Sequence, residues 1–578
     1  MIRRTTPAAP PGASPDDPRA TTEVPIAPEP NPSIASRFRA RDLRARVPGD
    51  GTRWTVALVM AIVACAAVML LHAAWADSMT IDEQFITHSA ACLVNTRLID
   101  LEPTDPAGAK LLASVGVGLS GVQTDGTCPS GTYEDATYHG LFSAPPSIGQ
   151  LRWLTFCARI VPILITLALI LICAWWAFQF GGPVAAVLAA ALIGFDPTLQ
   201  AMGHLVSVDV ALTFGFVAML AALWKWRTCG RARWLVLAGI GLGFALLSKA
   251  SGVILLPVAL ILILATAPGG VRARLRASWR PSALLIVVAY LELTVAYAPF
   301  RFSEPTAAWL PAGLNWLVPE SWLWGAYHQL IGHVGSSSAQ LSYLNGVAQG
   351  GGTWYYFPEA LLLKSTIAGL VVLVIGLGWL AVRRHAALLW CVLPGGVYFL
   401  AAMRAGIDIG IRYVTPAIVL FLLAGSVGIA LLPRGRIALA GALGAAAIIA
   451  TILGPVGSIG YFNAFAAGRH SYYLADSNID WGQDGYRLRA WWEQAGKPPI
   501  QVDLFGGLPA SYFVPTAIDL GSHPERGDYT GAAPVPGTTT VVSVNMGTLW
   551  SDWADVVAHP MCTLGTGLVV VGRTCSRT

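Results

Sequence analysis

The sequence predicts a mainly α-helical, polytopic membrane protein with a small α/β domain outside the membrane. Of its 578 residues, 55% are apolar and only 12% are charged, which is typical of membrane-embedded chains and not of soluble enzymes. Apolar runs of spanning length recur as far as about residue 455, and short β-type runs with Gly/Pro punctuation follow them. The net charge of +5 is modest and no Lys/Arg-rich run in a soluble segment is interleaved with aromatic residues, so we expect no nucleic-acid partner.

About eleven apolar runs predict transmembrane helices, each of which needs roughly 17 to 25 residues. They lie at about 54–76, 155–179, 183–195, 204–224, 234–248, 251–267, 282–300, 356–382, 386–402, 413–432 and 437–455. The runs at 183–195 and 234–248 are short for spans, and their ends are the least well defined.

Basic residues between these runs predict the orientation. The clusters lie in the N-terminal tail and at 225–233, 271–280, 383–385 and 433–436. With eleven spans they all lie on one side of the membrane, which the positive-inside rule makes cytoplasmic. The loops 77–152 and 301–355 and the C-terminal region 456–578 then lie on the extracytoplasmic side, and residues 54–455 form the transmembrane domain.

Two further regions complete the predicted organisation. Residues 1–53 are Pro/Ala-rich without apolar periodicity, which predicts a disordered cytoplasmic tail. Cys562 and Cys575 flank an apparent hairpin in the outer domain, and Cys92 and Cys128 share the first outer loop. Either pair could form a disulfide in that oxidising compartment, and free thiols are the alternative for Cys92 and Cys128.

Ionisable side chains lie near the outer ends of several predicted spans. Each is unfavourable there unless it is paired or lines a wet cavity, so each is a functional hypothesis. The group comprises Asp82, Glu83, His204, Asp209, Lys249, Glu292, Glu359, Lys364, Arg404, Asp408 and Arg412. For a single Lys or Arg the alternative is a side chain that extends to the interface, and for Glu292 it is a helix-packing hydrogen bond.

This convergence of acids and bases suits transfer from a lipid-phosphate donor. A carboxylate at the membrane surface can act as general base towards an incoming hydroxyl group. Lysine, arginine, or a divalent cation held by carboxylate and imidazole groups can neutralise a departing phosphate. The apolar spans would accommodate the lipid tail.

Five segments in order resemble motifs of the GT-C membrane glycosyltransferases of family 39, which include protein O-mannosyltransferases and the lipid A aminoarabinose transferase. After the Asp82-Glu83 pair they are "DPAGAKLLASV" (105–115), "GFDPTLQAMGHLVSVDVALTF" (194–214), "LLSKASGVILLPVAL" (246–260), "TWYYFPEALLLKST" (353–366) and "GIDIGIRYVTPAI" (406–418). "YYLADSNIDWGQD" (472–484) resembles a segment of bacterial members with an outer C-terminal domain. The resemblance covers nearly all of residues 54–578. In the 105–115 segment the family motif has a His and a second Pro that are absent here.

The resemblance implies an inverting transfer of one sugar from a polyprenyl-phosphate donor to a hydroxyl group of a protein, lipid or glycan acceptor. It makes Asp82 the candidate base, with Glu83 orienting it or contacting the sugar. The remaining candidate substrate-binding residues are Lys110, His204, Asp209, Lys249, Lys364 and Arg412, of which Lys249 and Arg412 are expected to neutralise phosphate. A divalent metal is possible, with Glu83, His204 and Asp209 as candidate ligands, and a supporting role for the latter two is the alternative.

Two other classes of protein are compatible with a charged membrane cavity. A transporter or flippase for a lipid-linked sugar would carry its site near the midplane, on broken helices of repeated halves, whereas Asp82 is expected at the outer surface. A scaffold of a cell-envelope complex would not require charges that converge on one site.

Two outer segments carry further expectations. The tryptophans of the 301–355 loop, among them Trp309, Trp316 and Trp322, predict interfacial helices over the lipid donor or a plain aromatic belt. The acidic segment 476–484 lacks the glycine and terminal glutamate of a calcium loop. We expect it to form an Asx-rich turn and helix cap that docks the outer domain over the site.

Overall fold

The computed structural model describes most of the chain from residue 49 onward. The described residues are 49–99, 105–123, 147–300, 318–327, 329, 341–506, 508–520, 535, 537–549 and 562–571. Most of the predicted tail, Trp309, Trp316, Cys128 and Cys575 lie outside them. Cys92 is disulfide-bonded, and its pairing with Cys128 stays a prediction.

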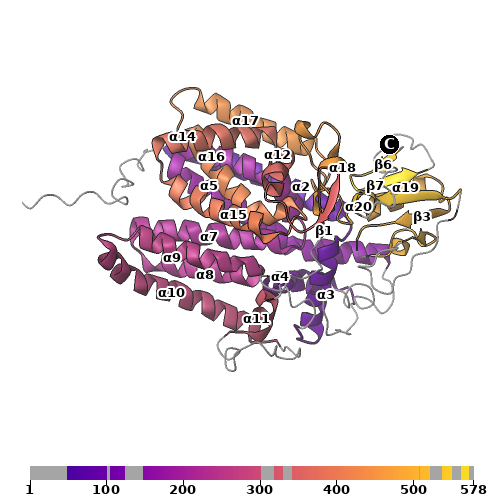
Figure 1. Cartoon of the computed structure of the whole chain (residues 1–578), viewed down its shortest axis with the longest axis horizontal. Helices are drawn as coiled ribbons and strands as arrows, with labels where there is room; N and C mark the ends of the chain where they lie inside the picture. Colours follow the sequence, from indigo (N-terminus) through magenta and orange to yellow (C-terminus); the bar gives the residue numbers. More distant parts are fainter. Residues whose placement is uncertain are drawn as a thin grey trace, which may run out of the picture.

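The predicted class, a mainly helical chain with a small C-terminal α/β region, is confirmed (Figure 1). Every predicted apolar run falls on helical structure. The elements of the bundle are α2 (Gly49–Ala76), α5 (Ile148–Gly194), α7 (Val208–Cys229), α8 (Ala232–Ser248), α9 (Leu255–Ala265), α10 (Val271–Tyr297), α12 (Tyr356–Lys364), α13 (Ile367–Val371), α14 (Leu377–Arg383), α15 (Leu393–Ala405), α16 (Thr415–Ala430) and α17 (Arg436–Ile452).

Helix α5 contains a chain reversal that accounts for two of the predicted spans. Gly182 has φ 73° and ψ −160°, a backbone conformation that glycine adopts readily and other residues rarely do. A Cβ atom on Gly194 would lie 3.5 Å from Ile170 Cδ1, although a continuous helix would separate these residues by roughly 36 Å. The two halves of α5 therefore run back along each other, as the separate runs at 155–179 and 183–195 predict.

The number of spans depends on how the shorter helices are counted. Among the described residues six helices are long and apolar enough to cross a membrane. A seventh span results if α12 and the helix Ile367–Arg383, which meet at an angle of 119°, are taken together. Helices α8, α17 and the segment Ala250–Ala265 are apolar but shorter. The count of eleven stays a prediction.

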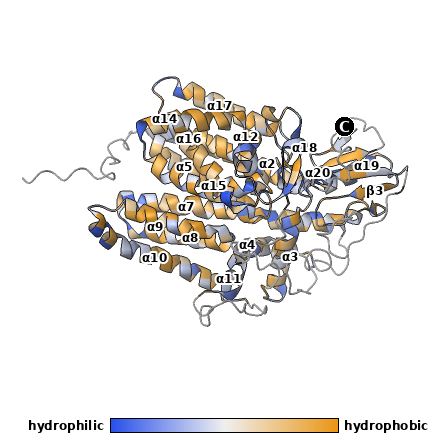
Figure 2. Cartoon of the chain, in the orientation of Figure 1, coloured by the Kyte–Doolittle hydropathy of each residue, from blue (hydrophilic) through white to orange (hydrophobic). Residues whose placement is uncertain are grey.

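The described basic clusters lie at the helix ends remote from the charged residues of interest. Helix α8 begins beside the 225–233 cluster and ends at Ser248, next to Lys249. Helix α16 follows Arg412 directly and ends at Ala430, before the 433–436 cluster. Figure 2 shows predominantly apolar helix bodies between these two ends. This separation is the pattern from which the orientation is predicted.

The C-terminal region folds around a five-stranded sheet of order β4-β3-β5-β7-β6. Its strands are β3 (Ile500–Asp503), β4 (Ile518–Asp519), β5 (Thr539–Ser543), β6 (Cys562–Leu564) and β7 (Leu568–Val571). Strand β3 pairs parallel with β4 and β5, and β7 pairs antiparallel with β5 and β6. Leu488 and Trp492 of α19 (Gly485–Gln494) pack with Val502, Val541 and Val570 in one apolar core.

A layer of short elements lies at the end of the bundle nearest this sheet. They are α3 (Ile81–Asn95), α4 (Ala107–Ser120), α6 (Pro197–Gly203), α11 (Glu320–Tyr327), the hairpin β1 (Leu341–Leu344) and β2 (Val347–Gly350), α18 (His470–Tyr473) and α20 (Val544–Leu549). Figure 1 shows α18 and α20 beside the sheet. The hairpin is tied to the chain near α18 because the Asn345 and Gly346 amides donate to the Tyr473 and Tyr472 carbonyls. The predicted site residues lie in or beside this layer.

Candidate functional site

The turn between α2 and α3 is shaped by a buried arginine from α5. The Arg159 guanidinium donates to the carbonyl oxygens of Ala74, Asp77 and Ser78 at 2.7–2.9 Å. It also donates twice to the Glu83 carboxylate, at 2.8 and 2.6 Å. An arginine that binds three carbonyls and a carboxylate fixes the path of the chain immediately before Asp82.

Glu83 is fully engaged by protein groups. Beyond Arg159, its carboxylate accepts from the Thr80 amide at 2.9 Å, from the Thr80 hydroxyl at 3.0 Å and from the Val206 amide at 2.9 Å. The residue is 1% exposed. Burial alone would raise the pKa of this carboxyl, but the charge and hydrogen bonds of Arg159 outweigh it and lower the pKa. Glu83 therefore caps α3 and orders the turn, and both of its oxygens are occupied.

Asp82, in contrast, points to a partly open position. Its Oδ2 accepts from Arg412 Nη1 at 2.6 Å, and its side chain is 24% exposed. Among the described residues nothing hydrogen-bonds to its other oxygen. One oxygen of Asp82 is thus held by a cation while the second is available to a substrate.

Arg412 connects Asp82 with Asp209 and, through it, with Lys249. Its Nη1 lies 3.6 Å from Asp209 Oδ2, and Asp209 Oδ1 accepts from Lys249 Nζ at 2.7 Å. The structure therefore brings four of the predicted residues into one chain of alternating charge. Within the described part of the chain, Arg412 Nε and Asp209 Oδ2 are buried without a hydrogen bond, so both retain capacity for a ligand.

Aromatic rings flank the two cations of this chain. The Arg412 guanidinium lies 4.1 Å from the Trp481 ring centroid and 5.1 Å from that of Tyr413, while Lys249 Nζ lies 4.0 Å from the Tyr413 ring. Cation–π contacts of this kind contribute about 0.5–2 kcal/mol each, more where water is excluded. Trp481 is 1% exposed, so the outer region supplies one wall of the site.

The segment 476–484 docks onto the turn that precedes Asp82, as expected, but the expected helix cap is wrong, because Asp484 at the start of α19 makes no side-chain cap hydrogen bond. The Ser78 amide donates to the Gln483 carbonyl at 2.9 Å and the Ile81 amide to the Trp481 carbonyl at 3.1 Å. The Ser78 hydroxyl donates to the Gly482 carbonyl at 2.6 Å and accepts from the Gly485 amide at 2.9 Å. Two segments far apart in the sequence thus position each other's backbone.

A second buried charge network runs beside the first. His204 Nε2 lies 3.0 Å from Asp77 Oδ2, and Arg487 donates to Asp77 Oδ1 at 2.7 Å and also to Asp484. His204 Nδ1 faces the Gln200 carbonyl at 2.8 Å, which only accepts, so Nδ1 carries a proton. Burial raises the pKa of Asp77, but His204 and Arg487 outweigh it and lower the pKa. The Asp77 carboxylate is thus held between the His204 imidazole and the Arg487 guanidinium.

The remaining predicted residues occupy different surroundings. Lys364 is buried and donates to the carbonyls of Ile459 and Asn478 at 2.6 and 2.5 Å, with Phe462 beneath it at 4.4 Å. Lys364 thus binds the backbone of the 476–484 segment at Asn478. Lys110 is fully buried near the start of α4, where it acts electrostatically on Asp105.

The three candidate metal ligands do not face one another. Glu83 is bound by Arg159, His204 by Asp77, and Asp209 by Lys249. Within the described residues no group of three His, Cys, Asp or Glu side chains is placed to hold a metal ion. These residues as arranged do not fit a metal site, and the chemistry below is derived without one.

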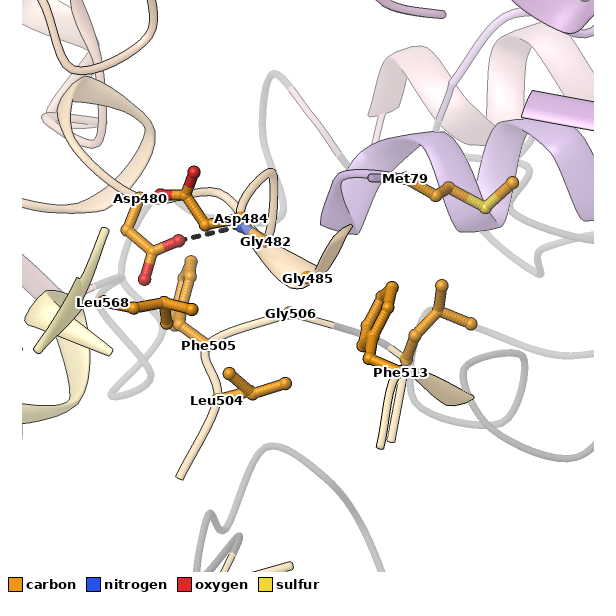
Figure 3. A pocket seen from close by; sticks show the side chains of 11 residues that line it. Met79, Asp480, Gly482, Asp484, Gly485, Leu504, Phe505, Gly506, Phe513 and Leu568 are labelled. Atoms are coloured by element: carbon orange, nitrogen blue, oxygen red, sulfur yellow. Dashed lines mark hydrogen bonds between the residues drawn. The ribbon is translucent and has the colours of Figure 1, made fainter. Parts of the chain in front are cut away.

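A small pocket adjoins the site on its outer-domain side (Figure 3). Met79, three positions before Asp82, lines it together with Gly482, Phe505 and Phe513. Asp480 at its rim accepts from the Gly482 amide at 3.0 Å and from the Ser543 hydroxyl. Burial raises the pKa of Asp480 to about 8. The pocket has a mixed polar and apolar lining, and the Asp480 carboxyl group in it is held by protein donors.

Sequence reasoning missed several residues that build this site. Arg159 and Asp77 order the turn, Trp481 covers Arg412, and Arg487 joins Asp77 to the outer region. Arg159 lies within the predicted span 155–179, so the rule that flags charges in spans could have found it.

One family model matches part of this chain. Residues 136–291 match the family model described as dolichyl-phosphate-mannose-protein mannosyltransferase. The match confirms the predicted resemblance to membrane glycosyltransferases that use polyprenyl-phosphate-linked sugars. His204, Asp209 and Lys249 lie within the matched segment. No curated protein matches the chain.

Solved structures are also similar to this chain at low sequence identity. ArnT from Cupriavidus metallidurans in the apo state is 13% identical with a TM-score of 0.48, covering 90% of this chain and 98% of that one. The protein O-mannosyltransferase Pmt1-Pmt2 complex of S. cerevisiae is 17% identical with a TM-score of 0.34, covering 44% and 34%. The oligosaccharyltransferase AglB from Archaeoglobus fulgidus is 13% identical with a TM-score of 0.47, covering 88% and 72%.

Proposed function

We propose that this protein transfers a sugar from a polyprenyl-phosphate donor to an acceptor hydroxyl group on the extracytoplasmic face of the membrane, with inversion. The observation that carries the proposal is the Asp82 carboxylate, which has one oxygen on Arg412 and the other available at a partly open position. A general base needs an accessible lone pair within reach of the hydroxyl group that it deprotonates. Asp82 meets this requirement, whereas Glu83 does not.

The cations beside Asp82 are suited to the leaving group. Arg412 and Lys249 lie in one chain with Asp82 and Asp209, and no described residue accepts a hydrogen bond from Arg412 Nε–H. A guanidinium group binds phosphate oxygens through a planar set of donors, and an ammonium group neutralises them as a point charge. We assign phosphate binding to Arg412 and Lys249, with the nearby Lys110 in support.

The reaction follows from this placement. The acceptor oxygen attacks the anomeric carbon from the side opposite the phosphate, and a new C–O bond forms as the C–O bond to phosphate breaks. The proton of the acceptor hydroxyl passes to Asp82, and polyprenyl phosphate leaves with the bonding electron pair, stabilised by Arg412 and Lys249. A single displacement of this kind inverts the anomeric centre.

The other predicted residues receive positioning roles. Glu83 fixes the turn that carries Asp82, and His204 holds Asp77 in the adjoining network. Lys364 supports the backbone at Asn478. None of these three meets the substrate in this assignment.

The basic clusters support the proposed sidedness. They lie at the ends of α8 and α16 that are remote from Lys249 and Arg412, so the site and the C-terminal domain would be extracytoplasmic and the N-terminus cytoplasmic. Donor and acceptor would then meet at the outer surface, with the polyprenyl tail in membrane lipid.

The test uses purified protein in lipid nanodiscs with a panel of undecaprenyl-phosphate sugars, starting with the mannose donor. We expect release of undecaprenyl phosphate with one donor, and a loss of at least about a hundredfold in Asp82→Asn. Glu493→Gln, a surface carboxyl on α19 that pairs with Arg489, is the matched control and should turn over normally. Undiminished turnover in Asp82→Asn would refute the assignment of the base. Movement of donor between leaflets without release of undecaprenyl phosphate would instead indicate a transporter.

A further inference from the structure

We propose that Asn478 is a positioning residue of the transfer reaction and holds Arg412 in place for the donor phosphate. The inference rests on the proposed function, because that function makes Arg412 the phosphate-binding cation. Asn478 belongs to the short helix Asp476–Asn478 of the outer region and is fully buried. It acts through the backbone beside Arg412 and not through contact with the substrate.

The Asn478 side chain joins three parts of the chain. Its Oδ1 accepts from the Ile411 amide at 3.1 Å. Its Nδ2 donates to the Tyr356 hydroxyl and to the Ala475 carbonyl, each at 2.9 Å. The Ile411 amide can only donate and the Ala475 carbonyl can only accept, so one orientation of the side-chain amide satisfies both. Asparagine therefore supplies an acceptor for the residue before Arg412 and also the donors that anchor this acceptor.

Ser477 holds the same backbone on the other side of Gly410. Its hydroxyl donates to the Ile409 carbonyl at 2.7 Å, while the neighbouring asparagine binds the residue after Gly410. A Cβ atom on Gly410 would overlap Ser477 Oγ, so this close approach requires glycine. Two consecutive side chains thus fix the backbone at the start of the short helix Ile411–Val414, which carries Arg412.

Arg412 needs a fixed backbone because its guanidinium serves two groups. Its Nη1 donates to Asp82 at 2.6 Å, and no described residue accepts from its Nε. In the proposed transfer this second donor meets the phosphate. A misplacement of about 1 Å can cost a reaction roughly a hundredfold in rate. A shift of the Ile411 backbone would therefore reach the phosphate through Arg412.

The experiment measures the Kd of undecaprenyl phosphate for the full-length, detergent-purified protein by native mass spectrometry. We expect Asn478→Ala to raise this Kd at least about tenfold. The matched control is Asn463→Ala, whose Kd should stay within about threefold of the native value. Both variants lose three hydrogen bonds and should lower the thermal unfolding midpoint. Asn463 is also buried, and its side chain bonds with the Leu362 and Ser365 carbonyls and the Phe465 amide.

A double-mutant cycle with Arg412→Ala separates this role from a structural one. If Asn478 acts through Arg412, Asn478→Ala should change the Kd by less than about twofold in the Arg412→Ala background, where Lys249 still binds the phosphate. A structural role would weaken binding equally in both backgrounds. If Asn478→Ala does not fold, Ser477→Ala, which removes one hydroxyl group, decides in the same cycle. Its Kd should rise about threefold, and no rise would overturn the inference.

Three results for Asn478→Ala would also overturn the inference. They are a native Kd, a loss equal to that of Asn463→Ala, and an effect that persists without Arg412. A native protein that neither binds undecaprenyl phosphate nor uses any donor would refute the proposed function itself. Native binding and turnover with an unchanged Kd in the variants would refute only the role of Asn478.

Discussion

Replacing Glu83 by glutamine tests whether this residue is structural or chemical. The substitution keeps the shape of the side chain and removes its charge. The two Glu83 oxygens accept five hydrogen bonds, two at Oε1 and three at Oε2. Glutamine has an NH₂ group in place of one of these two oxygens. At least two protein donors, one from Arg159 and one from Val206 or Thr80, would then face this NH₂ group and lose their acceptor.

The expected cost follows from these contacts. A buried donor left without its acceptor costs about 1–3 kcal/mol, and removal of one partner from a buried ion pair costs about 3–5 kcal/mol. Since the side chains of both Arg159 and Glu83 are almost completely buried, solvent provides little compensation. We expect the free energy of unfolding to fall by about 3–5 kcal/mol.

The assay is unfolding by SDS in mixed micelles, followed by tryptophan fluorescence, with donor turnover measured on the folded fraction. A second variant, Glu83→Gln with Arg159→Met, removes the orphaned charge and should recover part of the lost stability. The folded fraction of Glu83→Gln should retain its KM for the donor. A variant with unfolding free energy within about 0.5 kcal/mol of the native value but with a hundredfold loss of kcat would refute this reasoning, because Glu83 would then act in the chemistry.

Two further predictions concern the outer region. Trp481→Leu removes the ring over Arg412 but keeps an apolar side chain, so kcat/KM for the donor should fall about 2- to 30-fold, which corresponds to a cation–π contribution of about 0.5–2 kcal/mol; an unchanged value would contradict a role for this contact. Burial raises the pKa of Asp480 in the folded protein to about 8. Between about pH 4 and pH 8 this carboxyl group ionises more readily in the unfolded chain than in the folded protein, so the free energy of unfolding should decline as pH rises over that range. Asp480→Asn should show a weaker decline in thermal unfolding midpoint over that range, and an identical decline in both proteins would contradict the prediction.

Hydropathy was sufficient to predict the helical class and the position of each apolar run, because a spanning helix must be apolar along its length. It also located the reversal within α5, where the apolar run is interrupted at Gly182. The span count is harder to predict because α8 and α17 are apolar but short, and length alone does not decide whether such helices cross a membrane.

Part of the site could also be predicted from the sequence, because charged residues are unusual among apolar ones. Charges such as Asp209, Lys249 and Arg412 stand out against apolar neighbours, and the structure brings them together. Asp82 and Glu83 are adjacent in the sequence, yet consecutive helical residues point about 100° apart. They consequently face different partners, Arg412 for the first and Arg159 for the second. Sequence spacing cannot supply such tertiary partners.

The outer region is part of the site and not an appended module. Its Trp481 lies against Arg412, the residue that holds Asp82, while its backbone at Trp481 and Gln483 binds the turn that carries Asp82. Arg487 extends the same connection to Asp77. A displacement of the 476–484 segment would therefore alter the proposed base, Asp82, and the proposed phosphate-binding cation, Arg412, together. The two groups depend on the same contacts. The proposed transfer therefore requires the 476–484 segment to be ordered, because this one segment positions both Asp82 and Arg412.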